Sequence, residues 1–485
     1  MNRSKRCLVF FITCLSVALL QPFAIGAQEI PLLKTYAPDQ NDVPKHKKVF
    51  DDPTPWVKTW NDKAFMPPEV YAMIASDPEK MKTLWAETVG FKAPDVVGKI
   101  HPEIKPGKYT YTDVQANPAF KDLMYPDLYD RIKPGGPPFA GNIPEFEIIP
   151  TRQYYWALRI AEATKKNEGK TKLNADGYVD YKTWEGGFPY PRPSGPFKAQ
   201  QIAYNAFVFR RDRNEGNGIA YGYVYGFDKN LKMDMDNSMN SMSCMVAGRQ
   251  FLPPYGFFDE QAKANGELQL MTLTMLTPRD LAGMAILTTY YMDAQKADAA
   301  MIYVPSMRRI RKLSTTDTQD AINGQDLIYD DQSGFLQKLS PTRFPYKFEI
   351  VEEREYLVAA PTIDGAEYCT SNGLEFRGLK MERRPIYVLK MTQTDPNYVY
   401  SKRIFYIDQE TFEFYQVENY DQKGRLYRTF WTPYQFRPDI GMFTWGGYLL
   451  YRDHVDLHSN VNFFVDVTGV ASRDDIVGQI TKAGK

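Results

Sequence analysis

The pattern of apolar and polar positions changes near residue 200. From there onward, short runs rich in β-branched and aromatic residues follow one another, including IAYGYVYGF, GELQLMTLTML, GMAILTTYYM, AAMIYVP, YKFEIVEE, RPIYVLKMT, KRIFYID, FEFYQVENY and RLYRTFWTPY. Such runs are typical of β-strands. Turn residues separate them, in NEGNG, TPRDLAG, DAQKAD, DQE and DQKGR, and short turns join antiparallel neighbours. The pattern therefore predicts one large curved antiparallel sheet, or an open barrel, over residues 200–470.

Several of these runs, such as PIYVLKM and RIFYI, are apolar on both alternations. A sheet with one face in water alternates between apolar and polar side chains. The pattern therefore indicates either that both faces are covered or that one face lines an apolar cavity. An ordinary filled core explains it equally well.

The chain before residue 200 has a different character. Residues 28–150 are rich in Pro and predict short helices, for example in PPEVYAMIASDPEKMKTLWAETVG. Residues 151–199 combine a predicted helix, RQYYWALRIAEATKKNEGK, with a Gly- and Pro-rich loop. Residues 471–485 form a C-terminal tail.

The first 27 residues have the features of a secretory signal peptide. A basic head with Arg3, Lys5 and Arg6 precedes an apolar run over residues 8–20, and small residues follow at 24–27. The apolar run is too short to span a bilayer comfortably, and no later stretch reaches the roughly 20 apolar residues that a spanning helix needs. We expect an exported chain in a Gram-negative periplasm, with no transmembrane segment after cleavage.

Export changes how the cysteines are interpreted. Cys7 and Cys14 lie in the signal peptide, so Cys244 and Cys369 remain. An oxidising compartment permits a disulfide between these two. We predict this disulfide; the alternative is two separate buried thiols.

Charge adds one further feature. Lys plus Arg equals Asp plus Glu at 59 each, whereas a nucleic-acid-binding domain usually shows a basic excess. We therefore expect no nucleic-acid partner.

A local basic cluster nevertheless follows the apolar run MIYV, and an acidic segment, GQDLIYDD, follows the cluster. Because Arg binds carboxylates bidentately, we predict ion pairs between the members of the two groups; the alternative is two solvated loops. The groups are Arg308, Arg309 and Arg311, and Asp326, Asp330 and Asp331.

Signs of other chemistry are few. The sequence has no Gly-rich phosphate loop and no G-x-S-x-G motif, and it has only four His. In DHVDLH, a strand would place His454, Asp456 and His458 on one face. Two His and a carboxylate can hold a metal, although a polar surface strand is the commoner explanation.

A Met-rich segment, residues 233–245, surrounds Cys244. Its methionines are Met233, Met235, Met239, Met242 and Met245. Thioethers suit Cu(I), but Met is also an adaptable filler of apolar surfaces. We favour the filler interpretation, because the intervening Asp and Asn predict a loop beside a packed element.

Three blocks of the chain resemble a known family. DLAGMAILTTYYMDAQKADAAMIYVPSMRRIRKLS, GQDLIYDD and YKFEIVEEREYL are similar to the outer-membrane lipoprotein-sorting proteins, periplasmic relatives of LolA and LolB. The resemblance covers roughly residues 150–460. It implies a mainly β fold with flanking helices, in which a strongly curved antiparallel sheet forms an unclosed barrel whose hollow takes acyl chains. It also implies an RND-type exporter or an outer-membrane protein as partner, and structural support or partner contact as the role of the basic cluster. The Pro-rich N-terminal segment departs from the small carriers.

These observations favour an exported protein that binds or carries a lipid-like ligand, without catalysis, metal or cofactor. The apolar strands give a candidate cavity lining: Ile386, Val388, Leu389, Phe405, Phe412 and Phe414. Two alternatives stay open. One is an adaptor that docks to an outer-membrane component, and the other is a metal-dependent hydrolase that uses His454, Asp456 and His458.

Overall fold

A single large sheet organises the protein. The computed structural model describes residues 68–208, 218–313, 318–319, 321, 326–363, 369–370, 375–444, 448–468 and 473–482. The sheet has 15 strands in the order β1-β2-β14-β15-β16-β17-β20-β21-β5-β6-β7-β8-β9-β10, and β11 also pairs with β14. Its pairs are antiparallel, except for the parallel pair of β2 and β14. Among the described strands, β10 pairs with β9 alone. The sheet is therefore unclosed, and the predicted fold class is confirmed.

The strands run from the N-terminal third to the end of the chain. Their bounds are β1 Gly107–Thr110, β2 Glu145–Ile148, β5 Gly218–Phe227, β6 Met233–Met245, β7 Glu267–Thr277, β8 Ala285–Tyr291, β9 Ala299–Val304, β10 Arg309–Leu313, β11 Tyr346–Ala359, β14 Lys380–Gln393, β15 Tyr400–Asp408, β16 Phe414–Asp421, β17 Leu426–Trp431, β20 Tyr448–Asp453 and β21 His458–Thr468. Three small two-stranded sheets pair β3 Lys172–Leu173 with β4 Val179–Asp180, β12 Cys369–Thr370 with β13 Phe376–Arg377, and β18 Gln435–Arg437 with β19 Met442–Thr444.

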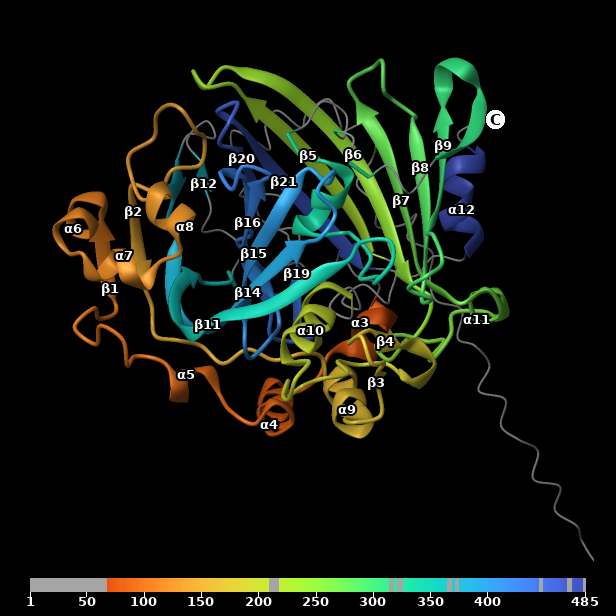
Figure 1. The fold of residues 1–485 in the computed structure, drawn as a ribbon, viewed down its shortest axis with the longest axis horizontal. Helices are drawn as coiled ribbons and strands as arrows, with labels where there is room; N and C mark the ends of the chain where they lie inside the picture. Colours follow the sequence, from red (N-terminus) through yellow and green to blue (C-terminus); the bar gives the residue numbers. More distant parts are fainter. Residues whose placement is uncertain are drawn as a thin grey trace, which may run out of the picture.

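Helices flank this sheet (Figure 1). The α-helices are α3 Pro68–Ile74, α4 Pro78–Val89, α5 Ala93–Val96, α6 Tyr111–Ala116, α7 Ala119–Leu123, α8 Pro126–Arg131, α9 Leu158–Asn167, α10 Lys198–Ala203, α11 Glu260–Asn265 and α12 Arg473–Lys482. Shorter turns include the 3-10 helices η4 Tyr181–Thr183, η7 Pro305–Met307 and η8 Tyr329–Gly334, and the π-helix η5 Tyr204–Val208. The helix predicted in residues 152–170 is α9.

Local sequence sets the ends of α4. The Asp77 side chain accepts a hydrogen bond from the Glu79 backbone N–H at 3.0 Å, Pro78 occupies the first turn, and Gly90 ends the helix in the left-handed conformation. The helix buries Trp85, whose ring nitrogen donates to the Glu410 carbonyl at 2.8 Å. This N-terminal helix is thereby attached to the turn between β15 and β16.

The two faces of the sheet are covered by different parts of the chain. Successive residues of a strand point to opposite faces, so Phe405 and Tyr406 define an inner and an outer face. The inner face carries η8, where a Cβ on Gly334 would lie 2.5 Å from the Phe414 ring. On the outer face, the Tyr406 ring packs against Tyr125 at 4.8 Å between centroids. Figure 1 accordingly shows α6, α7 and α8 beside the β11–β16 part of the sheet.

The structure of the Met-rich segment shows that the predicted loop is wrong. Residues 233–245 are not a loop but the 13-residue strand β6, which pairs with β5 on one side and β7 on the other. Hydrogen bonding on both edges overrides the turn preference of its Asp and Asn residues. Met239, Met242 and Met245 are buried, as the filler interpretation predicts.

Candidate ligand-binding site

A pocket of about 1020 Å³, partly open to solvent, lies at the end of the sheet where β7 begins and β8 ends. One wall comes from the β3–β4 segment, with Tyr178 and Trp184. The opposite wall includes Phe257, before α11, and Met292, directly after β8. Two segments more than 60 residues apart in the chain thus meet across the pocket.

Close backbone packing fixes the Trp184 wall. Gly248 has φ +66°, and a Cβ there would lie 2.2 Å from the Trp184 ring. Only Gly brings the backbone this close to the indole at that conformation. The Trp184 ring nitrogen donates to the Gly187 carbonyl at 3.0 Å, and the Gln250 side chain donates to the Glu185 carbonyl at 2.9 Å. The wall is therefore held in place without a ligand.

The chemistry of the pocket is amphipathic. Aromatic and aliphatic side chains make up much of its lining. The exposed polar lining residues are Asn174, Asp180, Lys182, Glu185, Lys263, Asp293 and Gln295. Small-molecule sites commonly combine an apolar interior with a few polar groups that orient the ligand. The pocket therefore suits a ligand with an apolar body and a polar or charged end.

A second apolar surface lies on the inner face of β5–β7. Val224, Met239, Leu273 and Met275 form a buried cluster, and Met284 packs against it from the β7–β8 connection. Further along this face, Ile286 and Ile302 are directly paired and half-buried. Of the methionines that the sequence singled out, Met239 belongs to this apolar surface and Met235 packs against it.

The six residues predicted to line a cavity are all buried in the core. The Phe405 ring lies 4.4 Å from that of Phe207 and 5.6 Å from that of Phe335, between centroids. The Phe412 ring stacks on Phe188 at 5.7 Å. The protein's own aromatic rings thus cover this part of the inner face. Leu389 pairs with Phe405 on the inner face, whereas Ile386 and Val388 pair with Asp408 and Tyr406 and therefore point to the outer face. Contact of the six residues with a ligand stays a prediction, and at Phe405 it would require Phe207 or Phe335 to move aside.

The predicted ion pairs between the basic cluster and the acidic segment are not formed within the described residues. Arg309 and Arg311 lie on β10, where every residue is exposed. Asp330 and Asp331 are buried, and Asp326 binds His458. The prediction is wrong because it rested on proximity in the sequence, whereas buried carboxylates need buried partners.

The buried partners of Asp330 and Asp331 come from β15 and from the segments beside β15 and η8. The Arg403 guanidinium lies 2.7 Å from Asp331 and donates to Asn419 at 2.8 Å. Asp330 accepts from the Tyr398 hydroxyl at 2.6 Å and from the Gln337 amide at 2.8 Å. Burial raises the pKa of Asp330 to about 6, and these bonds oppose that rise. The arrangement fixes η8 to the inner face.

The proposed His site is also corrected. His454 and Asp456 lie in the turn between β20 and β21, and His458 begins β21. The His454 ring nitrogen lies 3.1 Å from the Thr429 hydroxyl on the outer face, whereas His458 lies 3.1 Å from Asp234. Because a turn separates them, the two His side chains reach different partners. Within the described residues, no group of three or more His, Cys, Asp and Glu could hold a metal ion.

His454 borders a buried charged cluster on the outer face. Asp127, at the start of α8, binds Arg131 at 2.7 Å and lies 3.8 Å from Arg452. Burial and the neighbouring Arg131 lower the pKa of Arg452 to about 9. The cluster connects the N-terminal helices to β17 and β20, which is a structural role.

Glu418 adds a pH dependence to this region. Burial raises the pKa of this β16 carboxyl from 4.5 to about 7, helped by the charge of Asp127. Between these two pH values, the folded chain keeps a proton that the unfolded chain has released. The stability from this proton is therefore present below pH 4.5 and is lost as the pH rises to about 7.

Glu418→Gln should consequently increase the free energy of unfolding above pH 7, by about 1–3 kcal/mol, and change it little below pH 4.5. Urea unfolding at both pH values measures the difference, and Glu162→Gln on the exposed face of α9 is the control. An equal effect at both pH values would contradict the assignment.

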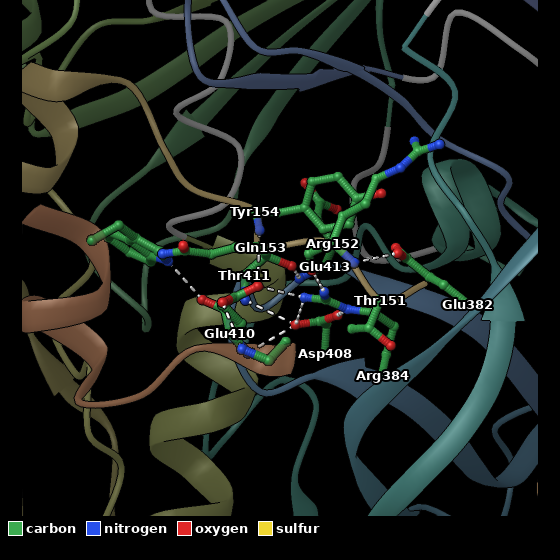
Figure 2. A network of polar contacts seen from close by, with 12 residues as sticks. Thr151, Arg152, Gln153, Tyr154, Glu382, Arg384, Asp408, Glu410, Thr411 and Glu413 are labelled. Atoms are coloured by element: carbon green, nitrogen blue, oxygen red, sulfur yellow. Dashed lines mark hydrogen bonds and ion pairs between the residues drawn. The ribbon is translucent and has the colours of Figure 1, made fainter. Parts of the chain in front are cut away.

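A third buried network joins β14 to the N-terminal segment (Figure 2). Arg384 is fully buried and binds Asp408 at 2.6 Å and Glu410 at 2.7 Å. Glu410 in turn accepts from the backbone N–H groups of Ala93 and Tyr154, at 2.9 and 3.0 Å. Because each acidic oxygen is used to hold backbone or Arg384, the network acts as a structural clamp.

The predicted disulfide is not tested. Cys244 is buried in β6, and its sulfur accepts from the Arg249 guanidinium at 3.5 Å. The side chain of Cys369 lies outside the described residues, as do residues 1–27 with Cys7 and Cys14. The Cys244–Cys369 bond stays a prediction.

The described architecture is that of a mainly β protein with an unclosed, curved antiparallel sheet and flanking helices. The chain belongs to the DUF1329 family, which is described as a family of proteins of unknown function; the match covers residues 129–473.

A curated relative shares part of this chain. It is 23% identical over 322 residues to the uncharacterized protein PA3922 of Pseudomonas aeruginosa, a match that covers 62% of this chain and 65% of that protein. The chain thus spans slightly less than two thirds of this relative's length.

Two crystal structures are similar in part. A putative outer membrane lipoprotein-sorting protein domain from Vibrio parahaemolyticus has 20% identity and a TM-score of 0.40, over 59% of this chain and 97% of that one. The LolA superfamily protein NE2245 from Nitrosomonas europaea has 16% identity and a TM-score of 0.34, over 57% and 96%. The family match over residues 129–473 confirms the predicted family. Among the described helices, none is long and apolar enough to cross a bilayer.

Proposed function

We propose that this protein binds a lipid-like hydrophobic ligand in the periplasm and carries it in cooperation with an RND-type exporter or an outer-membrane protein. The observation that supports binding is the pocket beside Trp184 and Phe257. Its lining combines apolar side chains with exposed charged ones, and a hydrogen bond to Gly187 fixes Trp184. Burial of an acyl chain there would be favourable by about 25 cal/mol per Å² of apolar surface.

The proposed periplasmic location and the proposed partner proteins are supported by other observations. The basic, apolar and small-residue pattern of residues 1–27 supports export. The resemblance to lipoprotein-sorting proteins supports a carrier that exchanges its cargo with membrane components. No catalytic step is part of the proposal.

A fluorescent fatty acid tests ligand binding directly. Purified, delipidated protein should take up the probe saturably, and phospholipid should compete with it. Phe257 lies in the pocket wall and is half-buried. Phe257→Glu places a charge in the apolar interior, so it should weaken binding about tenfold or more.

Tyr111→Glu is the matched control, because Tyr111 is an exposed aromatic residue on α6 and does not line the pocket. It should leave uptake unchanged. If no lipid class is taken up saturably, the carrier proposal fails and the adaptor alternative replaces it. If uptake is saturable but Phe257→Glu binds normally, the ligand occupies a different site.

A further inference from the structure

The hairpin of β9 and β10 ends the large sheet and carries the basic cluster. Strand β9 runs to Val304, the 3-10 turn η7 covers Pro305–Met307, and β10 returns from Arg309 to Leu313. Figure 1 shows β9 at the opposite end of the sheet from the N-terminal helices α6–α8. Since β10 is the last strand in the sheet order, one of its edges is unpaired among the described strands.

Exposed apolar side chains accompany the charges on this hairpin. Met307, Ile310 and Leu313 are 40%, 45% and 40% exposed. They make up three of the seven exposed large hydrophobic residues in the described chain. Three such residues lie within seven positions, on both faces and at the tip of the hairpin. Clustering of exposed apolar side chains is typical of interaction sites.

The basic side chains of the hairpin lie among these exposed apolar side chains. Antiparallel pairing places Arg309 and Arg311 opposite Val304 and Ile302, on the face that also carries Leu313. Ile310 and Lys312 point to the other face, and Arg308 follows the turn directly. Within the described residues, none of the four basic side chains forms an ion pair. Both faces and the tip of the hairpin therefore combine positive charge with apolar surface.

Protection of a sheet edge explains only part of this arrangement. Charged residues on an edge strand discourage unwanted strand addition, which accounts for the basic residues. It does not account for exposed Met307, Ile310 and Leu313, which favour association. An acidic peptide added along β10 would use one edge and leave Met307 and Arg308 at the tip without a role.

We propose that the β9–β10 hairpin docks the protein on an anionic lipid bilayer. The apolar side chains enter the boundary between headgroups and acyl chains, while the cations on both faces contact lipid phosphates. This docking does not depend on the pocket, so each activity can be lost without the other.

Sedimentation with vesicles tests the proposal on the full exported chain. The protein should bind vesicles that contain phosphatidylglycerol and should bind pure phosphatidylcholine vesicles weakly, with a loss of binding as salt is raised. Arg309→Gln combined with Arg311→Gln should reduce partitioning about 30-fold, since each basic residue near an anionic surface contributes about fivefold. Met307→Ser with Ile310→Ser should also reduce it.

Lys229→Gln with Lys232→Gln supplies the matched control, because these two exposed lysines lie in the turn between β5 and β6 and their loss changes the charge equally. This control should bind as the unmodified protein does. The proposal is overturned if phosphatidylglycerol makes no difference, or if the Lys229/Lys232 control loses as much binding as the Arg309/Arg311 variant. It is also overturned if the hairpin residues govern binding of fluorescent polyglutamate while vesicles are not bound, because the surface would then serve an acidic protein. Circular dichroism confirms that each variant is folded.

Discussion

Arg384→Met should lower the free energy of unfolding by about 3–5 kcal/mol, because it leaves two buried carboxylates without their cation. Arg384 binds Asp408 through two nitrogens, at 2.6 and 3.2 Å, and also contacts Glu410 at 2.7 Å. All three side chains are buried. Met fills much of the same volume, so the loss measures the charge and not a cavity. Urea unfolding gives the value.

Arg425→Met is the matched control for this prediction. Arg425 forms an exposed ion pair with Asp421 at 2.8 Å, four residues away, and such pairs contribute about 0–1 kcal/mol. A loss for Arg384→Met no larger than that of the control would show that Asp408 and Glu410 do not depend on Arg384. The clamp between β14 and the N-terminal segment would then be held by backbone contacts alone.

Arg403→Met should also cost about 3–5 kcal/mol, for the same reason on the inner face. Arg403 binds Asp331 at 2.7 Å, donates to Asn419 at 2.8 Å and lies 4.6 Å from the centre of the Tyr400 ring. Without it, Asp331 keeps a more distant cation, Arg428 at 3.9 Å. Because Asp331 belongs to η8, this loss should loosen the segment that fills the inner face.

A double replacement separates the charge from the packing. Arg403→Met with Asp331→Leu removes both charges, so it should recover part of the stability that Arg403→Met alone loses. Arg377→Met is the control, because Arg377 is half exposed and lies 3.7 Å from Glu145. If the double variant is as unstable as the sum of the two single variants, the pair is not coupled and the prediction is wrong.

These buried networks and the proposed ligand site divide the protein into two parts. The β14–β17 part of the inner face is filled by Phe207, Phe335 and η8. The β5–β9 part carries aliphatic and Met side chains, some of them half-buried, and the pocket lies at its end. A ligand therefore has less to displace beside β7 and β8 than beside β15. Uptake by Phe257→Glu and by the unmodified protein tests this directly.

The sequence predicted the elements well, because strand and helix preferences are local. The β-rich runs after residue 200 became the strands of the large sheet, and the helix expected in residues 152–170 is α9. The short turns predicted antiparallel neighbours correctly. The family resemblance predicted the unclosed sheet, and the match over residues 129–473 confirms the family.

Other predictions were wrong where contacts between distant segments determine the structure or the partner of a residue. The Asp- and Asn-rich segment 233–245 became a strand because β5 and β7 bond to both of its edges. Asp331 binds Arg403, 72 positions away, and not the arginines about 20 positions before it. His454 and His458 look alike in the sequence, but a turn sends them to opposite faces.

The sequence by itself thus determined most of the strands after residue 200, the antiparallel pairing of neighbours joined by short turns, and the family. Only the tertiary structure decided which charges are buried together and where the pocket lies. In the pocket wall, Trp184 packs against Gly248, and more than 60 residues separate the two in the chain. This contact requires the Gly248 backbone to lie close to the Trp184 ring, which no local sequence pattern encodes. The physical reason is that strand preference acts between neighbours in the chain, whereas the cost of burying a charge is offset only by whichever partner the completed fold brings within bonding distance.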